Sequence, residues 1–539
     1  MSIETQDTEA DGPDQSVLGA RTSTPNDRRQ RAAGARRTGT RWLSPISSDP
    51  RIRFGVAAGV AALWGLIAGR WTPRGPLTSG EAIWSIVISL VVGAVAGLVA
   101  RSRWALALAP VGFLVVFEIT RLGADGPMVD GLHFGFLGMV AFVTGRCVHA
   151  LLSLMPMLLG VVLGAGAART IDPGPSTRAS RVARVGRRSI AGLATVGLVA
   201  LTVALVRPAR TAEIVDADGK PVAGSIAELT SVDVNGHNLG MMIRGHNVDN
   251  PVLLFLAGGP GGTEFGAMRR HLPELEKHFT VATWDQRGSG TSYPELDPTS
   301  TITLDGYVED TVAVTNYLRE RFGQDRIYLA GQSWGTTLGV LAVQQRPALY
   351  RAFIGTGQMV SQRETDKIFY DDALAWARET GNDGLVDQLE SNGPPPYDDI
   401  TMYETSLANE QEVYAYDHSA NSEGEAQMSE NLFVEEYALI DQIHVLGGFM
   451  DTFSVLYPQL QTLDFRETAT TFDILVFFVQ GAHEADGRAD VFAEWYPQVE
   501  APDKDLIILD TSGHRPLFEQ PDAFVDFMTT TVLTRTRDD

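Results

Sequence analysis

The sequence contains a single cysteine, Cys147, and this excludes an intramolecular disulfide. Lysine is absent from residues 1–210, where 23 arginines and 12 acidic residues give a net charge of +11. Residues 211–539 carry 20 basic and 54 acidic residues, a net charge of −34. Because so acidic a surface repels phosphate backbones, we expect no nucleic-acid partner. The opposite charges of the two parts indicate different surroundings.

Residues 1–52 contain few large apolar side chains and are rich in Arg, Ser, Thr, Pro, Asp and Gln. Such a composition cannot bury enough apolar surface to fold, so we expect a disordered tail. A secretory signal peptide is not indicated, because the polar stretch is too long and no convincing cleavage pattern follows the first apolar run.

Residues 53–206 contain long apolar runs with almost no charge in their interiors. A helix needs roughly 20 apolar residues, and at least about 17, to cross a bilayer, and several of the runs reach that length. The longest run forms either two short spans broken at Arg146 or one span preceded by an interfacial segment. We therefore predict a transmembrane helical region of about five spans in a lipid bilayer. The runs are 54–69, 82–100, 104–120, 132–168 and 190–206, and Trp71, Trp84 and Trp104 lie near their ends, as in an interfacial belt.

The distribution of arginine predicts the orientation of these spans, because positively charged segments remain in the cytoplasm. Arginines are frequent before the first run and in segments 101–103 and 169–188, whereas segment 121–130 carries two aspartates. Only an odd number of spans satisfies this distribution, and five is preferred within a range of four to six. The tail is then cytoplasmic, and the chain after Val206 lies on the outer side of the cell membrane.

Residues 207–539 have the pattern of an α/β domain, in which short strand-like runs alternate with helical stretches such as 304–322. The turn Asn235-Gly236 joins the first two runs as a β-hairpin. The alternation predicts a mostly parallel sheet with helices on both faces. Residues 361–465 lack strand-like runs and are helix-rich and acidic, so we expect an inserted helical cap. The strand-like runs are 225–234, 239–245, 251–256, 279–284, 326–330, 352–355, 474–480 and 506–510.

Ser333 lies in the motif Gly-Gln-Ser-Trp-Gly of residues 331–335, directly after the strand-like run 326–330 and before a helical stretch. A Gly-x-Ser-x-Gly elbow places a serine hydroxyl on a strained turn at the end of a sheet, where a histidine and a carbonyl group can reach it. The two glycines are needed because a side chain at either position would crowd the turn. The motif predicts a serine hydrolase with the α/β-hydrolase fold.

A serine hydroxyl is a weak nucleophile until a base takes its proton. In this fold the triad order is Ser, acid, His, and His514 is the only histidine after the last strand-like run. The acid follows the preceding strand, whose end at Gly481 leaves Glu484 and Asp486 as candidates, with Glu484 favoured. Either carboxylate can accept the imidazole N–H and hold the tautomer.

An oxyanion hole needs two backbone N–H groups that point at the developing charge. One is expected from Trp334, the residue after the nucleophile. The other is expected from the loop Ala-Gly-Gly-Pro-Gly-Gly of residues 257–262, with Gly259 the favoured donor. This loop lacks the Gly-Lys-Ser/Thr ending of a nucleotide-binding P-loop. The predicted chemistry needs no metal and no organic cofactor.

Three motifs in this order resemble the proline iminopeptidase branch of the α/β hydrolases. They are Gly-Gly-Pro-Gly-Gly at 258–262, Asp-Gln-Arg-Gly-Ser-Gly-Thr-Ser at 285–292 and Gly-Gln-Ser-Trp-Gly at 331–335. The resemblance covers about residues 225–530 and none of the apolar region before them. It implies a serine aminopeptidase that removes amino-terminal residues, often proline, from short peptides.

Two positions depart from the family pattern. Ala257 stands where the family has histidine before Gly-Gly-Pro, and Glu484 stands where it has aspartate as the acid. The resemblance also implies cap glutamates that hold the amine of the substrate. Glu435 and Glu436 are the candidates, the alternative being that both are solvated acids of an acidic cap. Arg287 is expected in internal hydrogen bonds beneath the site.

The leading prediction is therefore a multi-pass membrane protein whose outer half is a serine aminopeptidase acting on short peptides. One alternative is an esterase or lipid-active hydrolase, because the same triad cleaves a small acyl substrate and the membrane brings lipid close. A second alternative is a transporter or sensor in which the hydrolase fold is a non-catalytic binding module. The oligomeric state is not specified by the sequence.

Overall fold

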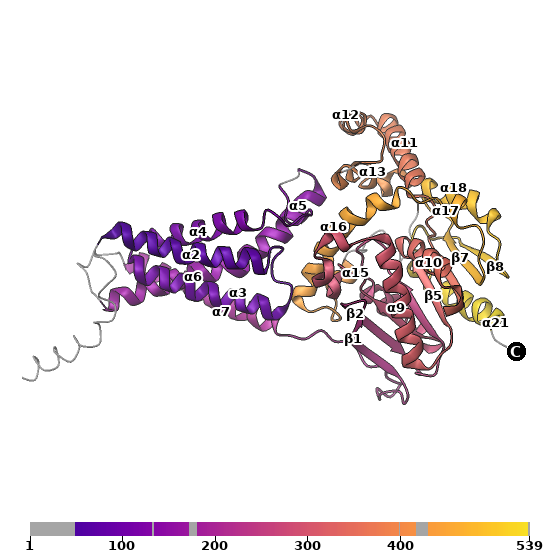
Figure 1. Cartoon of the computed structure of the whole chain (residues 1–539), viewed down its shortest axis with the longest axis horizontal. Helices are drawn as coiled ribbons and strands as arrows, with labels where there is room; N and C mark the ends of the chain where they lie inside the picture. Colours follow the sequence, from indigo (N-terminus) through magenta and orange to yellow (C-terminus); the bar gives the residue numbers. More distant parts are fainter. Residues whose placement is uncertain (1–48, 132–133, 172–180, 398, 417–428, 537–539) are drawn as a thin grey trace, which may run out of the picture.

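The computed structural model describes residues 49–131, 134–171, 181–397, 399–416 and 429–536. A helical bundle and an α/β domain lie end to end along the long axis of the molecule (Figure 1). Most of the expected tail lies outside the described residues. Helix α2 (Pro50–Trp71) nevertheless begins before residue 53, because Asp49 caps it by accepting from the backbone N–H of Arg51 and Pro50 suits its first turn.

The bundle contains four described helices that are long and apolar enough to cross a membrane. The segment from Phe136 to Ile171 is one continuous helix with a π-helical turn at Val143–Cys147, so the longest apolar run does not form two separate spans. Helix α4 is apolar but has only 16 residues. The helices are α2, α3 (Ser79–Ala100), α4 (Ala105–Thr120), α5 (Phe136–Phe142), α6 (Val148–Ile171) and α7 (Arg181–Leu205).

Small residues let α3 and α6 approach closely. A Cβ atom added to Gly93 would lie 2.0 Å from the carbonyl oxygen of Met157, and one added to Gly164 would lie 1.9 Å from that of Ala94. Close backbone contact at small residues is the usual way for apolar helices to associate where lipid removes the hydrophobic driving force.

The α/β domain is built on an eight-stranded sheet of order β1-β2-β4-β3-β5-β6-β7-β8, so the predicted fold class is confirmed. Strands β1 and β2 are antiparallel, and the strands from β4 to β8 are parallel to one another. Asn235 and Gly236 have φ values of 51° and 81°, as the predicted two-residue hairpin turn requires. The strands are β1 (Ile226–Val234), β2 (His237–Gly245), β3 (Val252–Leu256), β4 (Thr280–Trp284), β5 (Ile327–Gln332), β6 (Tyr350–Thr356), β7 (Leu475–Gly481) and β8 (Lys504–Leu509).

Helices cover both faces of the sheet. Alternate residues of β3 enter two different cores, with Leu254 in one and Leu253 in the other. The first core receives side chains from α9 (Leu304–Phe322), α10 (Trp334–Gln345) and α18 (Asp486–Trp495). The second receives them from α8 (Phe265–His271) and α20 (Pro521–Phe527).

The described part of the segment between β6 and β7 is helical, as expected for a cap. Helix α16 is the longest of these helices and lies between the bundle and the sheet (Figure 1). The described α-helices of the cap are α11 (Gln362–Thr380), α12 (Asp383–Asn392), α13 (Glu404–Leu407), α14 (Glu410–Val413), α15 (Ser429–Leu432), α16 (Leu439–Leu460) and α17 (Phe465–Thr468).

A buried polar cluster joins the bundle to α16. Arg74, between α2 and α3, donates from Nη1 to Asp451 Oδ2 at 2.8 Å and from Nε to Asp297 Oδ2 at 2.9 Å. Asp451 also accepts from the backbone N–H of Met128 at 3.1 Å and from the Tyr293 hydroxyl at 2.8 Å. The two parts of the chain therefore meet through specific and mostly buried contacts as well as through the covalent connection.

Candidate active site

The serine elbow has the strained geometry that the motif predicts. Ser333 follows β5 directly and has φ 53° and ψ −121°, in a region that non-glycine residues rarely adopt. A Cβ atom on Gly331 would lie 2.4 Å from the Gly335 carbonyl oxygen, and one on Gly335 would lie 2.1 Å from that of Leu256. The requirement for both glycines is therefore confirmed.

Ser333, His514 and Glu484 come together at the carboxyl edge of the sheet, although they follow three different strands. His514 Nε2 lies 2.8 Å from Ser333 Oγ, and His514 Nδ1 lies 2.7 Å from Glu484 Oε2. An ionised carboxylate only accepts, so Nδ1–H donates to Glu484 and Nε2 is left to accept from the serine hydroxyl. Of the two candidate acids the structure brings Glu484 to the imidazole, whereas Asp486 begins α18.

Glu484 is buried and held in its ionised form. Its Oε1 accepts from Arg488 Nε at 2.7 Å and from the backbone N–H of Ala485 at 2.9 Å. Burial by itself would raise the pKa of Glu484, but the charges and hydrogen bonds of Arg488 and His514 outweigh burial and lower the pKa to about 2. The group is therefore a carboxylate at any pH at which the protein is expected to work, and it can orient His514 throughout that range.

Arg488 was not identified from the sequence. It is buried on α18, stacks 4.8 Å from the ring centre of Phe369 and also pairs with Glu410 of the cap. Its position four residues after Glu484, in the first turn of α18, is the one signal that could have indicated it. The residue ties the acid of the site to the cap.

The glycine-rich loop lies against the elbow. A Cβ atom on Gly335 would also lie 2.9 Å from the Ala257 carbonyl oxygen. Gln286 braces both segments, since its Nε2 donates to Ala257 O at 3.3 Å and its Oε1 accepts from Trp334 Nε1 at 2.8 Å. The segments that carry the N–H groups of Gly259 and Trp334 thus meet beside Ser333, and the use of these two groups as the oxyanion hole stays a prediction.

Arg287 lies beneath the site in internal hydrogen bonds, as predicted. Its Nε donates to Asp310 Oδ2 at 3.0 Å, and its Nη1 donates to Thr301 O at 3.3 Å. Asp285, two residues earlier, is buried and accepts from Thr291 and from the Tyr437 hydroxyl. Burial raises the pKa of Asp285 to about 7.

Glu435 and Glu436, the candidates for holding the amine of a substrate, lie elsewhere. Glu435 is exposed and pairs with Arg210 at 3.0 Å, close to the point where the chain leaves the bundle. Glu436 is buried and pairs with Arg269 of α8. Neither residue lines the cavity at His514. Each glutamate is paired with an arginine that lies far from it in the sequence. These pairings could not be seen from the local sequence of an acidic cap, and this is why both residues were candidates for the amine.

A cavity of about 550 Å³, here called the joint chamber, opens beside the triad. Its walls come from helix α5 of the bundle, the cap segment 400–411 and α16, together with His514 from the loop after β8. The residues of the wall that matter for recognition and catalysis are Phe136, Leu137, Phe449, Met450, Phe453 and His514.

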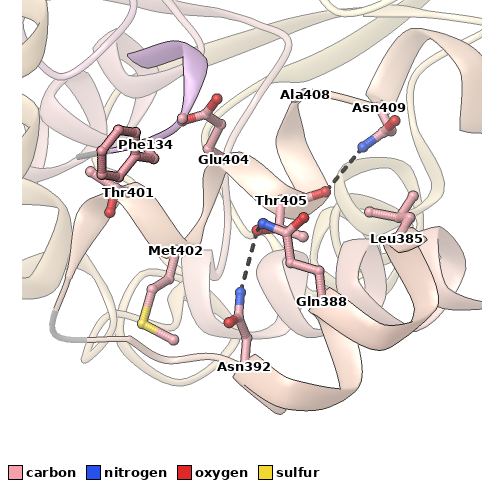
Figure 2. A pocket seen from close by; sticks show the side chains of 11 residues that line it. Phe134, Leu385, Gln388, Asn392, Thr401, Met402, Glu404, Thr405, Ala408 and Asn409 are labelled. Carbon is pink, nitrogen blue, oxygen red and sulfur yellow. Dashed lines mark hydrogen bonds between the residues drawn. The ribbon is translucent and has the colours of Figure 1, made fainter. Parts of the chain in front are cut away.

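A second cavity of about 330 Å³ adjoins the joint chamber. Figure 2 shows it with Phe134 and Glu404 on one side and with Leu385, Gln388 and Asn392 of α12 on the other. Glu404 lines both cavities. The joint chamber, which contains His514, is mainly apolar, whereas this second cavity is more polar.

The family comparison agrees with this geometry. A family model described as alpha/beta hydrolase fold matches residues 251–521, half of the chain. The chain belongs to the α/β hydrolase family. Within that family, its relatives are of the proline iminopeptidase type.

Two curated relatives and one solved structure illustrate the similarity. The hydrolase is 29% identical to the probable aminopeptidase YbaC of Bacillus subtilis (strain 168) over 309 residues, which cover 57% of this chain and 96% of the relative. It is 25% identical to a probable proline iminopeptidase of Leptolyngbya boryana, over 50% of this chain and 82% of the relative. A proline iminopeptidase-related protein from Thermus thermophilus is 21% identical, with 57% and 98% of the two chains covered and a TM-score of 0.41.

Proposed function

We propose that this hydrolase is a membrane-anchored serine aminopeptidase that removes amino-terminal residues from short peptides. Ser333 attacks the carbonyl carbon of the scissile bond, and His514 takes the hydroxyl proton and gives it to the leaving amine. Glu484 keeps the imidazole in the required tautomer. The N–H groups of Gly259 and Trp334 stabilise the oxyanion.

The observation that carries the proposal is the continuous chain of contacts from Ser333 through His514 to Glu484, at 2.8 Å and 2.7 Å. Peptides are favoured as substrates by the names of the curated relatives, a probable aminopeptidase and a probable proline iminopeptidase. The same catalytic groups can cleave esters, so the leaving group has to be tested directly.

The full-length protein in detergent is expected to hydrolyse aminoacyl arylamides, with prolyl and alanyl derivatives as first substrates. Acetyl and butyryl esters of the same chromophore, and amino-blocked versions of the arylamides, are the comparison. A free amine requirement and faster turnover of arylamides support an aminopeptidase. Turnover of esters alone would replace this proposal with an esterase.

We further propose that the bundle spans the membrane with the hydrolase domain outside the cell. The support is the four long apolar helices and the shorter apolar helix α4, which together make the odd number of spans that the arginine distribution requires. Externally added protease is expected to degrade the hydrolase domain in intact spheroplasts, while a cytoplasmic marker protein stays intact. Degradation only after lysis would contradict this orientation.

A further inference from the structure

The bundle supplies part of the wall around the candidate active site. Helix α5 extends beyond the end of α4 toward the cap (Figure 1), and Phe136 and Leu137 line the joint chamber that also contains His514. Leu137 of α5 and Phe449 of α16 both pack against a small core of Met128, Ala141 and Met450. An anchor that served only to hold the domain at a membrane would not need to line the chamber that contains His514.

Direct hydrogen bonds hold this wall in place. Glu404 of the cap accepts from the backbone N–H of Phe136 at 2.5 Å and from that of Leu137 at 3.2 Å. These are two of the N–H groups that a helix leaves unpaired at its N-terminus, and a carboxylate there is favourable. The two sides of the chamber are thereby joined across 268 residues of sequence.

The lining of the joint chamber is mainly apolar, so it favours apolar groups of a substrate. Its large side chains are those of α5 and α16, together with others from the cap segment 400–411. Its two glutamates already have partners, because Glu404 binds the α5 backbone and Glu410 pairs with Arg488. A volume of about 550 Å³ lies within the range of about 300–1,000 Å³ that is usual for small-molecule sites.

We infer that the joint chamber binds a large apolar group on the acyl side of the scissile bond, so that α5 of the bundle determines the specificity of the hydrolase. For a peptide this group is an aromatic or long aliphatic side chain of the amino-terminal residue. The inference rests on the proposed function, since it names the substrate class of that same site. Leu137 is its central residue, because it comes from the bundle, lines the chamber and packs against the core that includes Met450 of α16.

The experiment compares the alanyl, leucyl and phenylalanyl arylamides on the full-length protein in detergent. The wild type is expected to have a kcat/KM at least tenfold higher for the phenylalanyl than for the alanyl substrate, since each added methylene in an apolar pocket is worth roughly tenfold or more. Leu137→Trp fills the chamber and should lower kcat/KM for the phenylalanyl substrate tenfold or more, mainly through KM. Its effect on the alanyl substrate should be less than threefold.

The matched control is Met139→Trp, which adds a similar volume to the same helix at an exposed position outside the chamber. It should leave both rates unchanged. Labelling of Ser333 by a small fluorophosphonate reports whether each variant is folded. Leu137→Ala, which enlarges the chamber, provides a second variant and should shift the preference toward larger groups.

Failure of the proposed function can be distinguished from failure of the inference about α5. If the wild type neither labels at Ser333 nor cleaves any arylamide, the proposed function is wrong. If labelling and turnover depend on Ser333 but the substrate preference is the same in wild type, Leu137→Trp and Leu137→Ala, the catalytic proposal stands and the role of α5 is overturned.

Discussion

Replacement of Ser333 by alanine is expected to lower turnover of arylamides by about 10⁶-fold, as is usual when the nucleophile of such a triad is removed. The reason is geometric: Ser333 Oγ is the atom that His514 Nε2 contacts at 2.8 Å, and alanine leaves the imidazole with no hydroxyl to deprotonate. The measurement is kcat/KM on the arylamide panel, together with fluorophosphonate labelling, which should be abolished.

Ser454→Ala is the matched control for this substitution. Ser454 lies on α16, and its hydroxyl donates to the carbonyl oxygen of Asp451 in its own helix at 2.8 Å, away from the triad. Its loss should leave turnover within a factor of two. Activity near the wild-type level in Ser333→Ala would show that another nucleophile, or contamination, is responsible.

The sequence was sufficient to predict the fold and the three residues that meet at the candidate site, because their signals are local. Most strands of the sheet are short apolar runs, and Ser333, Glu484 and His514 come one, three and five residues after the ends of β5, β7 and β8. Chain order in this fold then limits which histidine and which acid can meet the serine. The choice between Glu484 and Asp486 needed the structure, because both lie on the same short segment and differ only in where α18 begins.

The contacts of the cap could not be predicted in this way. Glu404 and Phe136 are 268 residues apart, and nothing in either local sequence indicates that they meet. The same is true of Arg488 and Glu410. Family resemblance directed attention to Glu435 and Glu436, whereas the glutamates that line the joint chamber are Glu404 and Glu410.

The long apolar run of the bundle was ambiguous for a related reason. Arg146 interrupts it and suggested a break between two spans. In the structure the helix continues through a π-helical turn, where Arg146 donates to Val129 O at 3.0 Å and stacks 5.3 Å from the ring centre of Phe142. A charge with such partners does not end a helix, and the partners are visible only in three dimensions.

Replacement of Arg74 by alanine is expected to destabilise the junction between bundle and hydrolase by about 3–5 kcal/mol, the usual cost of removing one partner of a buried ion pair. The side chain of Asp451 is 0% exposed and would lose the cation that Arg74 provides. Burial raises the pKa of Asp451 to about 6 even beside Arg74, and without the arginine the pKa should rise further. The folded protein then binds a proton that the unfolded chain releases, so the destabilisation should increase as the pH rises above 6.

The same substitution should reduce activity, because α16 connects Arg74 to the glycine-rich loop. Asp451 lies on α16, and a Cβ atom on Gly261 would lie 2.6 Å from the carbonyl oxygen of Gly448 on the same helix. A shift of α16 therefore displaces the loop expected to hold the oxyanion. Thermal unfolding at pH 5.5 and pH 8, together with kcat/KM on the arylamide panel, measures both effects.

Two further variants decide whether the unpaired carboxylate of Asp451 causes the destabilisation of Arg74→Ala. Arg70→Ala removes an exposed arginine from the last turn of α2 and should change neither stability nor activity. Adding Asp451→Asn to Arg74→Ala removes the uncompensated carboxylate, so the double variant should be more stable at pH 8 than Arg74→Ala alone. If Arg74→Ala unfolds at the wild-type temperature at both pH values, the ion pair does not hold the two parts together. The catalytic domain would then depend on the bundle only through the wall that α5 contributes.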